Sequence, residues 1–147
     1  MTKYDTDFHA WTMEQAEALQ RRSANQLDWD NLAEELLSLG RSEENELKSR
    51  YTVLLTHLLK WKFQPAHRSR SWASTIKVQR RDLARHFRRN PSLQSVEAEE
   101  YSDAYELARL NASAETGLDV ERFPPEPPFT PEQAKADDWW PDETQPS

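Results

Sequence analysis

The residues best suited to do chemistry lie in the longest apolar run of the chain, positions 47–72. His57 and Lys60 are three positions apart, so on a helix they lie on the same side, one turn apart. A histidine titrates near neutral pH and a partly desolvated lysine can hold an anion, so the pair could serve acid–base or anion-binding chemistry. With two further polar residues they make up the candidate catalytic set, which is Glu35, His57, Lys60 and Arg80.

The same residues have a structural interpretation, which we favour over catalysis. His57 would hydrogen-bond a backbone carbonyl, and Lys60 would form an ion pair with Glu34 or Glu35. Glu46 and His57 lie about 16 Å apart along one straight helix, which is too far for both to bind one metal ion. The His-x-x-x-His spacing of a helical metal site is absent as well. We therefore expect no metal site and no cofactor. The sequence leaves open whether the protein is an enzyme, and we favour a protein that is not.

A second feature is the basic segment 60–89, which holds ten of the 19 basic side chains and one acidic residue, Asp82. The rest of the chain holds the other 25 acidic residues and nine basic ones. Basic side chains interleaved with aromatic ones are typical of nucleic-acid-binding surfaces. Alternatively, the aromatic residues belong to the core, and the basic residues face solvent or an acidic protein surface. In either case the candidate binding residues are Lys62, Arg68, Arg70, Arg80, Arg81 and Arg85.

A long central helix must position these groups. Residues at spacings of 4, 3, 4 and 3 form one apolar stripe, made up of Leu47, Tyr51, Leu54, Leu58 and Trp61. The same phase continues backwards through earlier leucines, which predicts a helix over residues 29–63. Such a helix is about 53 Å long, whereas a compact domain of this size is about 40 Å across. We therefore favour a bend or break near Gly40; the alternative is a helix that projects and is covered by a partner, such as the second chain of a homodimer.

The remaining segments complete an all-α fold. Helical patterns over residues 5–22, 72–89 and 91–116 flank the central helix, and seven prolines after position 118 exclude further long elements. Aromatic residues between those prolines predict a strap that packs back over the helices, although a ligand for a proline-binding domain is an alternative. We expect a compact bundle of about four main helices with a long central helix and a Pro-rich C-terminal strap. Residues 1–141 would form one helical domain and residues 142–147 a disordered tail.

Composition excludes several classes of protein. No apolar run approaches the roughly 20 residues of a membrane span, and the first residues show no signal-peptide pattern. The absence of cysteine excludes disulfides and zinc–thiolate sites and is consistent with a cytoplasmic protein. Two glycines are too few for a glycine-rich phosphate loop.

Several motifs occur in a familiar order: DFHAW, NLAEEL, LLTHLLKWKFQP, RSRSWASTI, NPSL and FPPEPPFT before WWP. With them the chain resembles the bacterial family known as "domain of unknown function 29", from about Tyr4 to about Pro141. The resemblance implies a small all-helical protein and brings no established activity. Where the family pattern usually has a third acidic residue after the Glu34-Glu35 pair, this chain has Leu37, which weakens any three-carboxylate metal site implied by the resemblance.

Three functional hypotheses follow. The leading one is a helical interaction module that self-associates and whose basic helix faces an acidic partner surface. The alternative is a nucleic-acid-binding protein that uses the same basic segment. The third is an enzyme whose glutamate, histidine and lysine form a polar site at the edge of the central helix.

Overall fold

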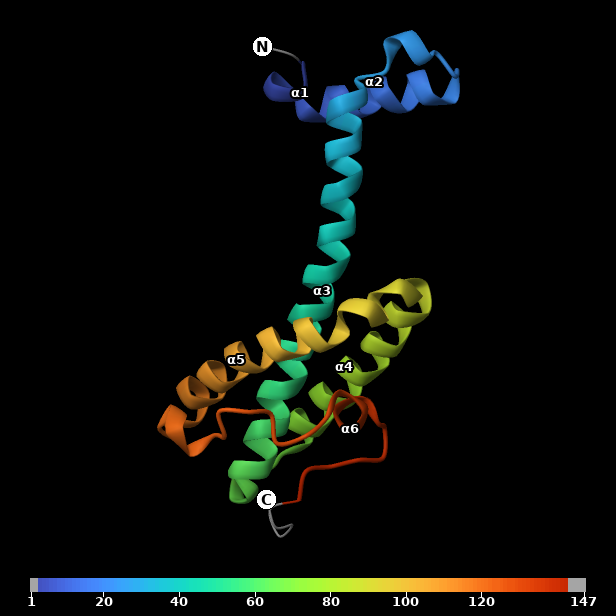
Figure 1. Ribbon diagram of the computed structural model, residues 1–147. Helices are drawn as coiled ribbons and strands as arrows, with labels where there is room; N and C mark the ends of the chain where they lie inside the picture. The colour runs from blue at the N-terminus through green and yellow to red at the C-terminus, as the bar shows by residue number, and fades with distance from the viewer. Residues whose placement is uncertain (1–2, 143–147) are drawn as a thin grey trace. The chain divides into compact units, whose positions relative to one another are not determined.

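The computed structural model describes residues 3–142, and every regular element in that range is helical (Figure 1). This confirms the all-α prediction with four main helices, one of them the long central α3, against which α4 and α5 pack. The α-helices are α1 (Lys3–Thr6), α2 (Phe8–Gln20), α3 (Trp29–Phe63), α4 (Arg70–Arg89), α5 (Glu97–Thr116) and α6 (Pro131–Lys135). Short 3-10 turns join them, at Ala24–Gln26, Pro65–His67, Pro91–Val96 and Val120–Arg122. None of the helices described is both long and apolar enough to cross a membrane.

The chain divides into two compact units, residues 1–42 and 43–147, of which the structure describes 3–42 and 43–142. The first unit holds α1, α2 and the beginning of α3, and the second holds the rest of α3 with the later helices. A single domain over residues 1–141 stays a prediction. The tail expected over residues 142–147 lies, from position 143 onward, outside the described residues.

Helix α3 is continuous for 35 residues, from Trp29 to Phe63. The bounds predicted from the apolar stripe are confirmed, and the break expected near Gly40 is wrong. The physical reason is that one glycine costs a helix only about 1 kcal/mol relative to alanine. The neighbouring leucines, glutamates and arginine favour helix, so the backbone hydrogen bonds continue through that position.

In the first unit, hydrogen bonds cap α2 and tie it to the start of α3. The Asp7 side chain accepts a hydrogen bond from the Ala10 amide and so caps α2. The Trp11 indole Nε1 donates to Asp28 Oδ2 at 3.0 Å, and the Asp28 amide donates to Gln15 Oε1 at 2.7 Å. Trp11, Gln15 and Ala18 are the buried residues of this unit within the described range. The unit is therefore held as much by hydrogen bonds as by a core.

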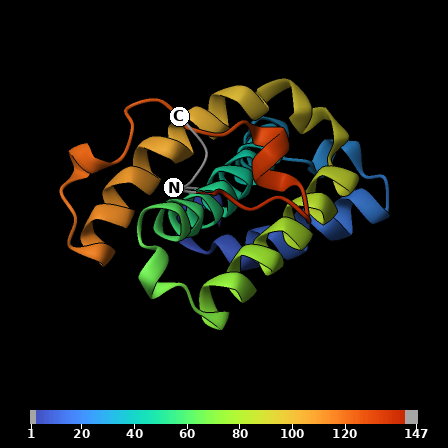
Figure 2. The same cartoon turned by 90° about the horizontal axis from the view of Figure 1, so that it is seen from below.

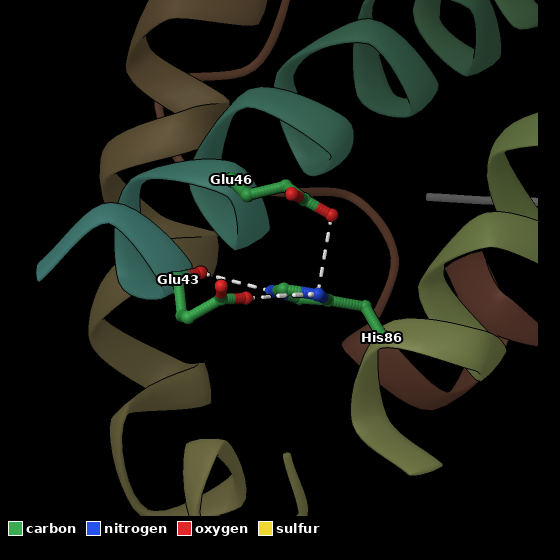
Figure 3. A group of neighbouring side chains, drawn as sticks. All are labelled: Glu43, Glu46 and His86. Atoms are coloured by element: carbon green, nitrogen blue, oxygen red, sulfur yellow. Dashed lines mark hydrogen bonds and ion pairs between the residues drawn. The ribbon is translucent and has the colours of Figure 1, made fainter. Parts of the chain in front are cut away.

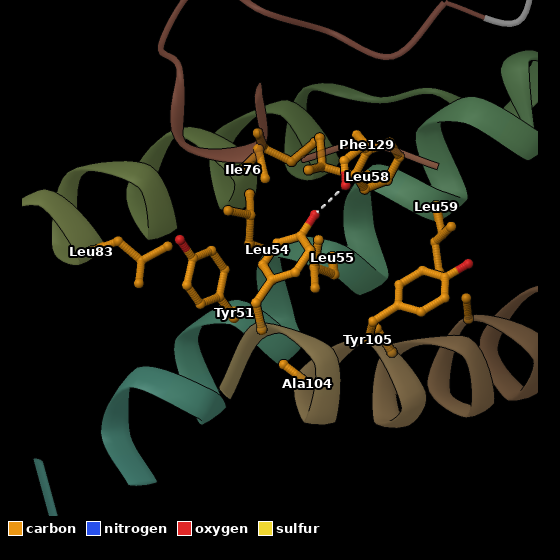
Figure 4. Packing of buried hydrophobic residues seen from close by; sticks show 14 of the residues in the cluster. Tyr51, Leu54, Leu55, Leu58, Leu59, Ile76, Leu83, Ala104, Tyr105 and Phe129 are labelled. Carbon is orange, nitrogen blue, oxygen red and sulfur yellow. Dashed lines mark hydrogen bonds between the residues drawn. The ribbon is translucent and has the colours of Figure 1, made fainter. Parts of the chain in front are cut away.

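The second unit has a continuous apolar core built on α3 (Figure 4). Leu47, Tyr51, Leu54 and Leu58 are fully buried, as the stripe predicted, and Trp61 is half-buried. Helices α4 and α5 both pack against α3 (Figure 2) and contribute Ile76, Leu83, Ala104, Tyr105, Ala108 and Ala112. Each fully buried leucine or isoleucine stabilises the fold by roughly 1.5–3 kcal/mol relative to an exposed one.

The segment 117–142 packs over this core as the predicted strap. Gly117 ends α5 in the left-handed conformation, with φ 77°. Phe123 and Phe129 are buried, and the Tyr101 hydroxyl donates to the Phe129 carbonyl at 2.7 Å. From α4, the Arg80 guanidinium donates to three strap carbonyls, those of Ala134, Asp137 and Trp139.

Candidate functional site

Two glutamates of α3 and one histidine of α4 converge in the second unit (Figure 3). His86 Nδ1 lies 3.1 Å from a Glu46 carboxylate oxygen and 3.6 Å from a Glu43 carboxylate oxygen. The other ring nitrogen, Nε2, lies 2.9 Å from the Glu43 backbone carbonyl. The imidazole is buried, with 5% of its surface exposed, whereas both carboxylates are about half exposed. We name Glu43, Glu46 and His86 the His86 cluster.

A second set of side chains orients the His86 cluster. Asn90 Nδ2 lies 3.4 Å from Glu43 Oε2, and Arg50 Nε donates to Glu46 Oε2 at 3.1 Å. Arg50 also donates from Nη1 to Asp82 Oδ2 at 3.1 Å. The carboxylates are thus directed by α3 and by α4 together. Arg50 therefore bridges Glu46 of α3 and Asp82 of α4.

A polar pocket of about 220 Å³ adjoins the cluster, lined by Glu46, Arg50, Asp82, Arg85, His86 and Arg89. Arg85 and Arg89 are exposed, and no ion pair holds either of them within residues 3–142. The pocket can therefore take a water molecule or a small anionic group beside the imidazole and the carboxylates.

The four candidate catalytic residues are all held in place by neighbours. His57 Nδ1 lies 2.9 Å from the Val53 carbonyl on its own helix, as the structural interpretation predicted. The Arg80 side chain is buried under the strap, and Glu35, in the first unit, accepts a hydrogen bond from the Tyr4 hydroxyl. That contact raises the pKa of Tyr4 to about 12.

Lys60 forms its ion pair with Glu115 of α5, at 2.8 Å. The expected partner, Glu34 or Glu35, was wrong, because both precede Lys60 on the same helix by more than six turns. The Lys60 ammonium also lies over the Trp72 ring, 4.8 Å from its centroid. Lys60 therefore links α3, α4 and α5.

The candidate binding residues divide into two groups. Lys62 lies near the Asp142 carbonyl and over the Phe63 ring, and Arg68 donates to the Trp61 carbonyl at 2.8 Å. Arg80 is buried. The remaining candidates, Arg70, Arg81 and Arg85, lie on the outer surface of α4 together with three other basic residues. This surface, which we name the basic face, consists of Arg70, Lys77, Arg81, Arg85, Arg88 and Arg89. All six are exposed, and none has an ion-pair partner in the part of the chain that the structure describes.

The first unit carries an apolar groove of about 400 Å³ between α2 and the beginning of α3. Four of its apolar side chains are about half exposed or more, unlike the residues of a core: Phe8 48%, Leu19 52%, Leu36 68% and Leu39 63%. The lining also includes Trp11, Ala16 and Leu32. We name these seven residues the apolar groove.

The His86 cluster was not predicted from the sequence. His86 lies three positions after Leu83, so it falls in the inner stripe of α4, and Glu43 and Glu46 share the same i, i+3 spacing on α3. Both signals can be read in the sequence. Their meeting depends on the register between α3 and α4, which no single-helix pattern specifies.

The fold agrees with what the sequence motifs imply. Comparison with curated proteins and with solved structures gave no match. A family model described as "Domain of unknown function DUF29" matches residues 3–140, which is nearly the whole chain. The chain belongs to this family.

Proposed function

We propose that this protein is a helical interaction module that self-associates through the apolar groove. The observation that carries the proposal is the exposed apolar lining of that groove, above all Leu36 and Leu39 of α3. Contiguous exposed apolar surface on a small unit marks a protein–protein contact.

The size of the first unit supports a permanent partner. It spans about 40 residues, and Trp11 and Ala18 are the buried apolar side chains within its described range. Units this small, without disulfides or metals, usually need oligomerisation to reach a stable fold. Burying the apolar groove against another apolar surface would supply the missing core.

A second copy of the chain is the occupant that the groove favours. The first unit offers a hollow between α2 and α3 whose lining includes the strongly exposed leucines Leu36 and Leu39, and these side chains can enter the hollow of a second copy. In a twofold-symmetric dimer the same patch meets itself, so it must offer both a ridge and a hollow. A second copy of the chain is also available in every cell that makes the protein, as a permanent partner must be.

Analytical ultracentrifugation of the full chain tests this proposal. The wild-type chain should sediment as a dimer, and the double variant Leu36→Glu with Leu39→Glu as a monomer, because charges in an apolar interface lose their hydration without a partner. Neither leucine belongs to the core of the second unit, so most of the helical circular dichroism should remain. Leu110→Glu on α5, where the leucine is 59% exposed, is the matched control and should remain a dimer. A wild-type monomer, or a dimer that survives both substitutions, would refute the proposal.

The basic face of α4 favours a further contact with an acidic macromolecule. Six cations lie along one 20-residue helix without an ion-pair partner among residues 3–142. The aromatic side chains of the basic segment pack elsewhere: Trp61 against Trp140, and Phe63 against Phe123. Since no aromatic ring of these pairs is free to stack on a base, we favour an acidic protein surface over nucleic acid.

Binding of polyglutamate and of a single-stranded oligonucleotide, each measured against salt concentration, separates the two ligands. We expect tighter binding of polyglutamate, with affinity that falls as salt rises. Lys77→Gln with Arg81→Gln should weaken it, and Arg21→Gln in the first unit should not. Preferential binding of the oligonucleotide would favour the nucleic-acid alternative, and no binding at low salt would exclude both.

A further inference from the structure

The His86 imidazole has a defined orientation of its two ring nitrogens. Nε2 faces the Glu43 backbone carbonyl at 2.9 Å. A carbonyl oxygen can only accept, so Nε2 must carry the hydrogen of this contact. In the neutral ring, Nδ1 is then the nitrogen with the free electron pair, and it faces the carboxylates.

Three electron-pair donors therefore meet at one point. His86 Nδ1 and one oxygen each of Glu43 and Glu46 lie within 4.8 Å of one another. Such donors repel one another unless a positive centre lies between them. Arg50, which donates to the same Glu46 oxygen, offsets part of that repulsion, and a proton on Nδ1 or a metal ion would offset the rest.

The spacing of the donors fits a metal ion. Ligands about 2.1 Å from a zinc-sized ion lie about 3.0–3.4 Å apart when they occupy neighbouring positions. The Nδ1–carboxylate distances are 3.1 Å to Glu46, which is inside that range, and 3.6 Å to Glu43, which is slightly beyond it, so a small rotation of the partly exposed Glu43 side chain would complete the set. We propose that Glu43, Glu46 and His86 bind a divalent transition-metal ion.

The surroundings of the cluster resemble those of a metal ligand set. Metal-binding histidines usually donate their second ring nitrogen to a carbonyl or carboxylate, and ligating carboxylates are themselves hydrogen-bonded. Here Nε2 contacts the Glu43 carbonyl, Asn90 contacts Glu43, and Arg50 donates to Glu46. These contacts hold the three donors in place before an ion arrives.

The donor set indicates which ions bind. One imidazole and two carboxylates, with no thiolate, suit Zn²⁺, Fe²⁺ or Mn²⁺ better than Cu⁺. Three protein ligands leave at least one coordination position, as in catalytic rather than structural zinc sites. That position faces the pocket, where Arg85 and Arg89 would attract an anionic co-ligand.

Calorimetric titration of the tag-free full chain with Zn²⁺ tests the site, and Co²⁺ absorption reports its ligands. We expect one ion per chain and visible Co²⁺ bands without sulfur charge transfer, because the chain has no cysteine. Glu43→Gln and Glu46→Gln should each weaken binding by at least about tenfold, since even outer-shell changes cost about 10–100-fold. Both glutamates are partly exposed, so these variants should fold, which circular dichroism will check.

Two controls make the result specific. Glu44→Gln changes the adjacent carboxylate of α3, and His67→Asn removes an exposed histidine outside the cluster; both should bind Zn²⁺ like the wild type. No saturable binding by the wild type would refute the proposal, as would equal binding by the two ligand variants. In either case His86 would serve only as a hydrogen-bonding partner that joins α4 to α3.

Discussion

The Arg80 guanidinium donates a hydrogen bond from Nη2 to the Trp139 carbonyl at 2.6 Å. It thereby joins the buried side of α4 to the end of the strap. The same side chain donates from Nε to the Ala134 carbonyl at 2.7 Å, and its carbon atom Cζ lies over the Trp140 ring. Burial lowers the pKa of Arg80, and Asp137 and Asp138 oppose that change.

Replacing this arginine should loosen the strap. Arg80→Met keeps much of the volume but leaves the strap carbonyls without a donor, and each unpaired buried group costs about 1–3 kcal/mol. We expect urea unfolding to show a loss of about 3 kcal/mol. Arg81→Met, next along α4 but exposed, should change stability by less than about 0.5 kcal/mol. Equal effects of the two variants would show that the Arg80 contacts do not hold the strap.

The two glycines should respond to alanine in opposite directions. Gly40 lies inside α3 with nothing within 4 Å of an added methyl group, so Gly40→Ala should stabilise the protein by about 0.5–1 kcal/mol. Gly117 has φ 77°, a region that costs other residues about 1–2 kcal/mol, so Gly117→Ala should destabilise it by that amount. Thermal unfolding of both variants measures the difference. A loss of stability in Gly40→Ala would contradict a continuous α3.

Acid should weaken the first unit through Asp28. Hydrogen bonds from Asn31 and from Trp11 lower the pKa of Asp28, so its carboxylate is more stable in the folded chain. A carboxyl group whose pKa is lower in the folded than in the unfolded chain stabilises the fold at pH values above its unfolded pKa of about 4. That stabilisation disappears as the pH falls through the pKa of the folded state. Asp28→Asn should therefore show a smaller loss of stability between neutral and acidic pH, measured by urea unfolding. Glu106→Gln, an exposed change on α5, should retain the wild-type pH dependence.

Alkali should act through the tyrosines. Burial raises the pKa of Tyr105 to about 12 and also raises those of Tyr51 and Tyr101. A tyrosine whose pKa is higher in the folded than in the unfolded chain contributes its full stabilisation at pH values below its unfolded pKa of about 10. That stabilisation is lost as the pH rises through the pKa of the folded state. Ultraviolet titration should therefore detect little tyrosinate before about pH 11, followed by ionisation and unfolding together. Ionisation of all four tyrosines near the unfolded value in folded protein would contradict the burial of these rings.

The fold could largely be predicted because its main helices carry strong local signals. The stripe through Leu47, Leu54 and Leu58 specifies both a helix and its buried side, and Gly117 ends α5 where its position indicated. The order Thr130-Pro131-Glu132-Gln133 is typical of a capping box, and Thr130 and Gln133 form one at the start of α6. Each of these features depends on residues within a few positions of one another.

The site could not be predicted in the same way, because it depends on contacts between helices. The sequence places Lys60 on an edge of α3, but only the packing of α5 supplies Glu115 as its partner. The pattern of α4 alone allows either Gln79 or Arg80 in its inner stripe. Arg80 is the buried one, since strap carbonyls more than 50 residues later accept its hydrogen bonds. The His86 cluster likewise exists only once α3 and α4 are in register.

The position of these carbonyls has a consequence for biosynthesis. The acceptors of Arg80 follow it by 54 to 59 residues, so they leave the ribosome long after α4 has emerged. Until then the Arg80 guanidinium has no strap carbonyl to which it can donate, and burying a charged group without a hydrogen-bond partner is unfavourable. The second unit should therefore complete its folding only after translation of the strap, and chaperones would meet a partly open helical intermediate before that point.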